Sequence, residues 1–192
     1  MNKNMPAPWK QIRSEPGPDL RIFRVRYDWL ENPRNAHPLK AVILEIADWV
    51  NVVAITPAQK IVVVHQYRFG VGTMTVEIPA GVIEPGEPPE HAARRELQEE
   101  TGYTTADWQA LGWVEPNPAI QNNRCHFWLA TDVRKTHAPH LDEGEDIAVQ
   151  ELTLAELREE IRTENFRNAL GLLALSRVCN VWDGFQPAMG RL

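Results

Sequence analysis

Three neighbouring glutamates, Glu96, Glu99 and Glu100, have the types and spacing to bind a divalent cation together. Residues three or four apart are neighbours on a helix, so these carboxylates share one helical side with Ala92. Carboxylate oxygens are the ligands that a hard cation such as Mg²⁺ prefers. At helical spacing Glu96 and Glu100 meet no lysine or arginine, although Arg95 can reach Glu99. Like charges so spaced destabilise a helix by about 0.2–0.5 kcal/mol per pair, which a bound cation would offset.

The helix that carries these glutamates is expected to run from Pro88 to Thr101. Pro85-Gly86 forms a turn signal ahead of it, and proline is tolerated in a first helical turn because the first amide groups lack partners. Gly102 is expected to end the helix as its C-cap. A solvated acidic face is the ordinary interpretation of such a helix. The glycine loop and the small alanines beside the carboxylates favour a cation site instead.

The segment from Gly81 to Tyr103 resembles the signature of the Nudix hydrolases. That signature is a glycine, five residues, a glutamate, seven residues, Arg-Glu, a bulky apolar residue, any residue, Glu-Glu, any residue, a glycine and a bulky apolar residue. These positions are filled here by Gly81, Glu87, Arg95, Glu96, Leu97, Glu99, Glu100, Gly102 and Tyr103. Tyr103 is the one departure, since the family more often has an aliphatic residue there.

The resemblance implies a role for each polar residue of the signature. The implied metal ligands are the carbonyl of Ala80 and the carboxylates of Glu96, Glu99 and Glu100. The expected metal is Mg²⁺, with Mn²⁺ as the alternative. Arg95 would hold the glutamates in place by hydrogen bonds, so Arg95 and Glu99 also count among the expected catalytic residues. Glu87 would brace the loop or bind the metal through water.

An acidic loop, His140 to Asp146, is expected to supply the proton acceptor for the attacking water. Such a loop is ordinarily just solvated, but the helix glutamates are expected to be occupied as ligands. In similar enzymes a glutamate in this loop is the base. The pattern Gly-Glu-x-Ile favours Glu145 as the base, and Glu143 is the alternative and a candidate substrate contact.

The flanks of the signature resemble those of the ADP-ribose subgroup of the family. Glu77-Ile78-Pro79-Ala80-Gly81 and Gln66-Tyr67-Arg68 are typical of that subgroup, and Pro118 gives weaker support. Arg68 is ordinarily a surface charge, but the resemblance implies that its planar fork binds substrate phosphate. Phe23 or Trp29 would stack on the base, although packing in a core is the ordinary role of both. Lys40 stands where related enzymes often have another arginine.

The expected activity is metal-dependent hydrolysis of the diphosphate bond of ADP-ribose or a related nucleoside diphosphate sugar. The products would be a nucleoside monophosphate and a sugar phosphate. Two alternatives stay open: a Nudix hydrolase of another nucleoside diphosphate derivative, and a Nudix module that senses a nucleotide without catalysis.

The resemblance implies an α/β fold, a Nudix-type α/β/α sandwich with a mixed sheet, preceded by a small antiparallel sheet. Residues 1–48 would form that N-terminal sheet and dimerisation region, and residues 49–192 the hydrolase domain. A loose lead-in over residues 1–19 and a frayed tail from Asp183 are expected. Further predictions are strands over 21–30, 39–47, 74–78, 111–115, 125–130 and 147–152, and a hairpin of 50–56 with 60–67. Helices are predicted over 153–161, where Thr153 and Glu156 form a capping-box pattern, and from 163 or 165 to 179.

Composition narrows the choice of partners. The chain has 192 residues and a net charge of −6, which argues against nucleic acid as the main partner. Cys125 and Cys179 are expected to be reduced and buried. The chain shows no signal peptide or membrane span, so a cytoplasmic protein with a small-molecule nucleotide substrate is expected. The resemblance also implies a homodimer formed through the N-terminal sheet.

Overall fold

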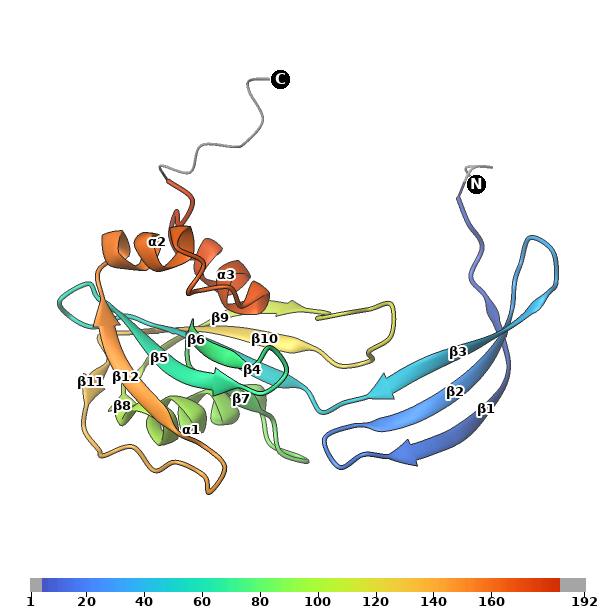
Figure 1. Ribbon diagram of the computed structural model, residues 1–192, viewed down its shortest axis with the longest axis horizontal. Coiled ribbons are helices and arrows are strands. Elements are labelled where there is room, and N and C mark those ends of the chain that lie inside the picture. The colour runs from blue at the N-terminus through green and yellow to red at the C-terminus, as the bar shows by residue number, and fades with distance from the viewer. Residues whose placement is uncertain (1–4, 184–192) are drawn as a thin grey trace. The chain divides into compact units, whose positions relative to one another are not determined.

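The computed structural model describes residues 5–183, and the chain divides into two compact units (Figure 1). The N-terminal unit consists of residues up to Ala47 together with Glu115–Arg124. The larger unit consists of Asp48–Val114 together with the residues from Cys125 onward. The expected frayed tail lies, beyond Asp183, outside the described residues. The assignment of dimerisation to residues 1–48 and of hydrolysis to residues 49–192 remains a prediction.

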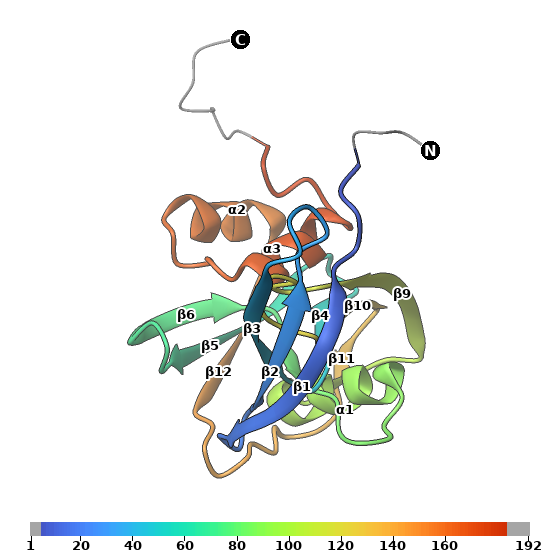
Figure 2. The same cartoon turned by 90° about the vertical axis from the view of Figure 1, so that its right-hand side faces the viewer.

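The N-terminal unit is built on an antiparallel three-stranded sheet, whose strands Figure 2 shows side by side. Its strands, in spatial order, are β1 (Lys10–Asp19), β2 (Arg24–Glu31) and β3 (Pro38–Glu45). The expected loose lead-in is therefore wrong from Lys10 onward. Pro16 is accommodated because β1 is an edge strand, and its register shifts between Pro16 and Asp19. Arg13 adds a cation–π contact, 3.8 Å from the centre of the Trp29 ring.

The segment Glu115–Arg124 joins this unit through the end of β3. The backbone amide of Leu44 donates to the carbonyl of Ile120 at 2.7 Å. The side-chain amide of Asn123 donates to the carbonyl of Ala47 at 3.1 Å. A loop distant in sequence thus completes the unit.

The larger unit contains two principal sheets. The first has the order β7 (Ala80–Val82), β4 (Trp49–Ala54), β10 (Cys125–Thr131) and β9 (Asp107–Val114), and its β4–β10 pair is parallel. The second has the order β12 (Ile147–Leu152), β5 (Ile61–Arg68) and β6 (Thr73–Glu77). A short pair joins β8 (Tyr103–Thr104) to β11 (Arg134–Lys135).

The predicted hairpin of 50–56 with 60–67 does not form as one ladder. β4 and β5 belong to different sheets, and the segments share one isolated bridge between Ile55 and Ile61. β4 instead pairs with β10, which lies far away in sequence. Two apolar β-branched runs joined by a short turn predict strands, but their partners are chosen by the rest of the fold.

Helices cover both faces of these sheets (Figure 1). α1 (Pro89–Thr101) packs on Val50 and Val52 of β4, whereas α2 (Leu154–Arg162) and α3 (Ala169–Ser176) pack on the opposite face with Val53. The expected α/β/α sandwich with a mixed sheet is thus confirmed. None of the helices in residues 5–183 combines the length and apolar content that a membrane span requires.

The two C-terminal helices differ in how well the sequence predicts them. α2 begins with the expected capping box between Thr153 and Glu156. α3 begins later than expected, because Glu164 adopts a φ of 61° and Asn168 caps the helix. Residues 164–168 are therefore a loop, and this loop contributes to the site described below.

Candidate active site

Helix α1 turns Glu96, Glu99 and Glu100 toward one cavity. It ends as predicted, with Gly102 in the left-handed region at φ 77° and its amide bonded to the carbonyl of Gln98. Its apolar side packs Ala92, Ala93 and Leu97 into the core. The glutamates are therefore held on a helix whose orientation is set by core packing.

The cavity has a volume of about 240 Å³. Every residue predicted as a metal ligand lines it, together with both predicted arginines and the favoured base. The lining residues are Gln66, Arg68, Ala80, Gly81, Val82, Arg95, Glu96, Glu99, Glu100, His140, Asp142 and Glu145. Segments from four parts of the sequence thus meet as the Nudix resemblance implies, although the role of each residue remains a prediction.

Two of the carboxylates in this cavity are buried and have raised pKa values. Glu100 is 3% exposed, and its carboxylate accepts a hydrogen bond from the backbone amide of Ala80 at 3.1 Å. Burial raises the pKa of Glu100 well above its usual value, and the charges of Glu96 and Glu145 raise it further. Burial likewise raises the pKa of Glu96 to about 7, despite the opposing effect of Arg95. The protein alone therefore disfavours two negative charges here.

Arg95 is the hub of the acidic cluster. Its guanidinium contacts Glu96 at 2.8 Å and Glu99 at 3.1 Å. It also forms a two-point contact with Glu87, at 3.0 Å for each bond, and donates to the carbonyl of Val82. The expectation that Glu96 has no cation on its own helix is wrong, because the adjacent Arg95 folds back to reach it. The contact with Glu87 matches the expected bracing of the loop.

Gly81 is required by its closeness to Glu96. A Cβ atom at this position would overlap the Glu96 carboxylate more closely than real side-chain carbons approach one another. Any larger residue would displace that carboxylate, so the glycine in strand β7 supplies room for Glu96.

The loop that carries Glu145 is fastened to the end of α1. The amides of Thr136 and His137 donate to the carbonyl of Gly102 at 3.0 and 3.1 Å, and the amide of His140 donates to that of Glu99 at 2.8 Å. Beyond this clamp, the amide of Asp142 donates to the Glu145 carboxylate at 3.0 Å. The loop therefore holds Glu145 at the cavity edge.

Arg68 also lines this cavity, and it is paired with a buried carboxylate. Its Nε and Nη2 each donate to Glu77 at 2.8 Å. Burial acts to raise the pKa of Glu77, but the hydrogen bonds and charge of Arg68 outweigh it and hold that pKa below its usual value. Glu77 is thus a satisfied anion, in contrast with Glu100.

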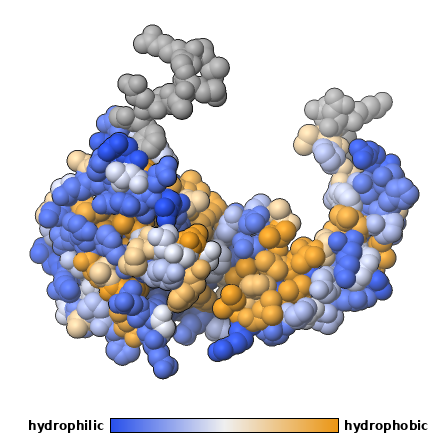
Figure 3. Space-filling model, in the orientation of Figure 1, coloured by the Kyte–Doolittle hydropathy of each residue, from blue (hydrophilic) through white to orange (hydrophobic). Residues whose placement is uncertain are grey.

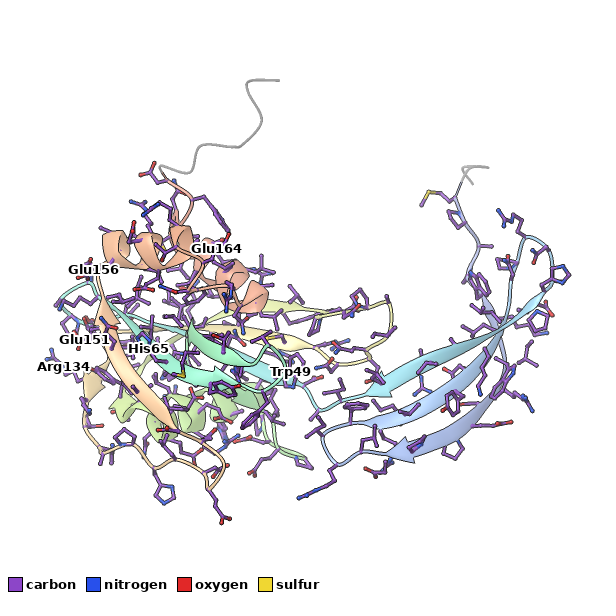
Figure 4. All side chains as sticks on the ribbon, in the orientation of Figure 1. Trp49, His65, Arg134, Glu151, Glu156 and Glu164 are labelled. Carbon is purple, nitrogen blue, oxygen red and sulfur yellow. The ribbon has the colours of Figure 1, made fainter. Side chains whose placement is uncertain are left out.

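A second cavity, of about 360 Å³, shares a wall with the first. The shared residues are Arg68, Ala80, Gly81 and Val82. Its other lining residues are Trp49, which Figure 4 labels at the start of β4, and Val50, Asn51, Asn168 and Leu170. The pair of cavities therefore places an acidic compartment beside a largely apolar one, with Arg68 between them.

Three predicted substrate contacts are not among the residues that line these cavities. Phe23 and Trp29 belong to the N-terminal unit, where Arg13 already covers the Trp29 ring. Glu143 lies in the acidic loop, exposed to solvent. His140, Asp142 and Asn168 line the cavities and were not predicted. The acidic loop pattern pointed to the first two, but no local signal pointed to Asn168.

The carboxylates have the chemistry to bind a divalent cation, but they are not arranged as a complete set of metal ligands. Within residues 5–183, no three histidine, cysteine or carboxylate side chains already converge around one point as metal ligands. Arg95 occupies one oxygen each of Glu96 and Glu99. The buried carboxylate oxygens of Glu96 and Glu100 are nevertheless the type of donor that Mg²⁺ and Mn²⁺ bind.

Comparison with known proteins assigns the family. The model of the NUDIX domain matches residues 47–170. This chain belongs to the Nudix family. An ADP-ribose pyrophosphatase of Bacillus subtilis (strain 168) is 34% identical to this Nudix hydrolase over 70% of the chain and 74% of that relative. A methanol dehydrogenase activator of Bacillus methanolicus is 35% identical over 86% of the chain and 90% of that relative.

The fold of this Nudix protein also matches a solved structure. The crystal structure of an ADP compounds hydrolase superposes with a TM-score of 0.79, covering 91% of this chain and 94% of the other. The sequences are 23% identical, so this likeness establishes the fold. The chain is therefore a Nudix hydrolase by family, and two of its relatives, at 34% and 30% identity, are named ADP-ribose pyrophosphatase.

Proposed function

We propose that this Nudix hydrolase uses Mg²⁺ or Mn²⁺ to cleave the diphosphate bond of ADP-ribose or a related nucleoside diphosphate sugar. The products are a nucleoside monophosphate and a sugar phosphate. The observation that carries the proposal is the pair Glu96 and Glu100, buried with raised pKa values in a cavity that Arg68 also lines. Such a cavity favours a cation among its carboxylates and an anion beside its arginine. Relatives named ADP-ribose pyrophosphatase and GDP-mannose pyrophosphatase support this substrate class.

Each residue has a chemical task in this proposal. Glu96, Glu99, Glu100 and the carbonyl of Ala80 hold the cation, which when bound neutralises phosphate oxygens and makes water more acidic. Arg95 keeps Glu96 and Glu99 oriented through its bonds to both.

Glu145 is the proposed general base. It takes a proton as the water oxygen bonds to phosphorus, while the bridging P–O bond breaks and its electron pair leaves on the departing phosphate. Arg68 binds a phosphate oxygen. Glu143, Phe23 and Trp29 remain proposed contacts of the sugar or base.

A homodimer through the N-terminal sheet is part of the proposal. Orange patches on this unit in Figure 3 mark apolar residues. The large apolar side chains that are exposed on it are Trp9, Ile12, Leu20, Ile22, Leu39 and Val42. A second copy of the chain would cover such residues. Light scattering of the wild type should give twice the chain mass, and Ile12→Arg with Val42→Glu should give the single mass. A monomeric wild type would refute the dimer.

A cytoplasmic location is also proposed. Cys125 is buried and Cys179 half-buried, and both are free thiols, as expected for a protein kept in a reducing compartment. Labelling both thiols in freshly lysed cells would test this, and finding them oxidised would contradict it.

A panel of diphosphates tests the activity. Purified protein with Mg²⁺ is offered ADP-ribose, ADP-glucose, GDP-mannose, a dinucleoside polyphosphate and coenzyme A, with chromatography of the products. We expect fastest release of a nucleoside monophosphate from ADP-ribose or another sugar diphosphate, and none after chelation. Fastest turnover of a substrate without a sugar diphosphate would favour another Nudix hydrolase activity. Binding of ADP-ribose without AMP release would favour a sensor.

A second candidate function follows from the relative named methanol dehydrogenase activator, because its likeness spans most of both chains. The protein would then activate a dehydrogenase. Adding it with Mg²⁺ to the Bacillus methanolicus methanol dehydrogenase should raise methanol oxidation under this candidate. No change at equimolar protein would dismiss it.

A further inference from the structure

The side chain of Asn168 both accepts and donates hydrogen bonds. Its Oδ1 accepts from the amides of Leu170 and Gly171, both at 3.0 Å, and so caps α3. Its Nδ2 donates to Oε2 of Glu77 at 2.8 Å, across 91 residues of sequence. The start of α3 is thereby joined to the last residue of β6.

Glu77 passes this connection to Arg68. Its Oε1 accepts from Arg68 Nε at 2.8 Å and from Thr75 Oγ1 at 2.7 Å, and its Oε2 accepts from Arg68 Nη2 at 2.8 Å as well as from Asn168. Four donors thus surround a carboxylate that is 3% exposed. A carboxylate held at both oxygens cannot rotate without losing a bond, so the plane of the bound guanidinium is held with it.

This leaves one nitrogen of Arg68 for a ligand. Within residues 5–183, Nε and Nη2 are taken by Glu77, whereas Nη1 has no partner in the protein. Arg68 lines both cavities, and Asn168 lines the larger one. The direction in which Nη1 offers its protons is therefore decided by Glu77 and by what holds Glu77.

The backbone adds a second attachment at the same place. The amide of Val76 donates to the carbonyl of Asn165 at 3.1 Å, so the loop ahead of α3 is bonded to β6. Gly171 then lies against Phe166, with a Cβ at that position only 3.0 Å from the ring. Asn168 is thus placed opposite Glu77 by contacts on both sides of it.

We infer that Asn168 is a positioning residue, which acts through Glu77 to hold the Arg68 guanidinium in the orientation that binds substrate phosphate. The phosphate contact rests on the proposed function, whereas the restraint on Arg68 does not. Without the Asn168 donor, Glu77 and Arg68 regain rotational freedom, which substrate must then remove on binding. The effect should fall on substrate binding more than on the chemical step.

The test separates the cap of α3 from the bond to Glu77. Asn168→Ser keeps a good N-cap but is too short to donate to Glu77, and Asn168→Ala loses both. Thr153→Ala, which removes the cap of α2, is the matched control for a lost helix cap remote from Arg68. The first readout needs no activity: the ¹⁵Nε signal of Arg68, its order parameter and its hydrogen-exchange rate.

We expect Asn168→Ser to lower the Arg68 order parameter and speed its exchange, with Thr153→Ala leaving both unchanged. With ADP-ribose and Mg²⁺, Asn168→Ser should raise KM about fivefold and change kcat less than about twofold. In an Arg68→Ala background it should add no further rise. An unchanged Arg68 signal in Asn168→Ser would overturn the inference. An equal KM rise with and without Arg68 would also overturn it. If Asn168→Ser loosens Arg68 but the wild type hydrolyses none of the diphosphates, the proposed function is refuted, whereas the inference that Asn168 restrains Arg68 still holds.

Discussion

Glu77 and Glu100 are equally buried, each 3% exposed, but the protein shifts their pKa values in opposite directions. Glu77 receives four hydrogen bonds, two of them from Arg68, and its pKa is lowered. Glu100 accepts one bond, from Ala80, and its pKa is raised. Hydrogen-bond donors of the protein therefore satisfy the Glu77 carboxylate, whereas the Glu100 carboxylate is left for a bound cation to satisfy. Burial alone does not distinguish a structural carboxylate from a ligand-binding one, whereas hydrogen-bond satisfaction does.

The sharpest contrast should come from removing the charge of Glu100. Glu100→Gln keeps an acceptor for the amide of Ala80 but loses the negative charge, so turnover of ADP-ribose with Mg²⁺ should fall at least about 100-fold. Folding stability should change little. Steady-state kinetics and thermal melts measure the two quantities, and unchanged turnover would refute the ligand assignment.

The loop glutamates should differ from each other. Glu145→Gln should slow hydrolysis by about 100-fold while sparing Mg²⁺ affinity, because the proton acceptor is lost but the ligands remain. Glu143→Gln provides the comparison: as a proposed substrate contact, Glu143 should affect KM, and kcat should stay within about twofold of wild type. If Glu143→Gln is instead the slow variant, Glu143 is the base.

Removing the charge of Glu77 should harm folding where the Glu100 variant does not. Glu77→Gln leaves Arg68 without its counter-charge, although Arg68 is partly exposed and water reduces the cost. We expect a loss of about 2 kcal/mol in the free energy of unfolding. Urea denaturation beside Glu100→Gln provides the comparison, and equal losses in the two variants would remove the distinction drawn between them.

The metal-free protein should also show a pH dependence of stability. Because the folded pKa of Glu96 is about 7, above its ordinary 4.5, the folded state binds more protons between these values. That contribution to stability is present below about pH 4.5 and is lost as the pH rises through about 7. In chelator, the melting temperature of wild type should therefore fall relative to Glu96→Gln across this range. A constant difference would contradict the raised pKa.

The sequence predicted the helix that carries the acidic residues well, because the signals for it are contiguous. Pro88, Gly102 and the spacing of Glu96 and Glu100 are local signals, and α1 formed where they indicated. The capping box of α2 was predicted for the same reason. The contact of Arg95 with the adjacent Glu96 was missed, because spacing rules describe side chains of residues three and four apart and not those of neighbours in the chain.

What escaped prediction depends on contacts between distant segments. β4 and β5 formed in the expected places but in different sheets, since β4 gains its partner from β10. β1 was hidden by its prolines, which an edge strand accommodates. Asn168 became visible only when α3 and β6 were seen together, because no local pattern relates it to Glu77.

The most direct measurement is the titration of the Glu100 carboxyl by ¹³C NMR, first in chelator and then with Mg²⁺. Without metal, we expect a Glu100 pKa well above 4.5, because of burial and the charge of Glu96. With Mg²⁺, we expect the Glu100 pKa to be lower than in chelator, because metal binding competes with protonation of a ligand. A Glu100 that titrates near 4.5 in chelator, or whose titration Mg²⁺ does not move, would contradict a cation site at this carboxylate.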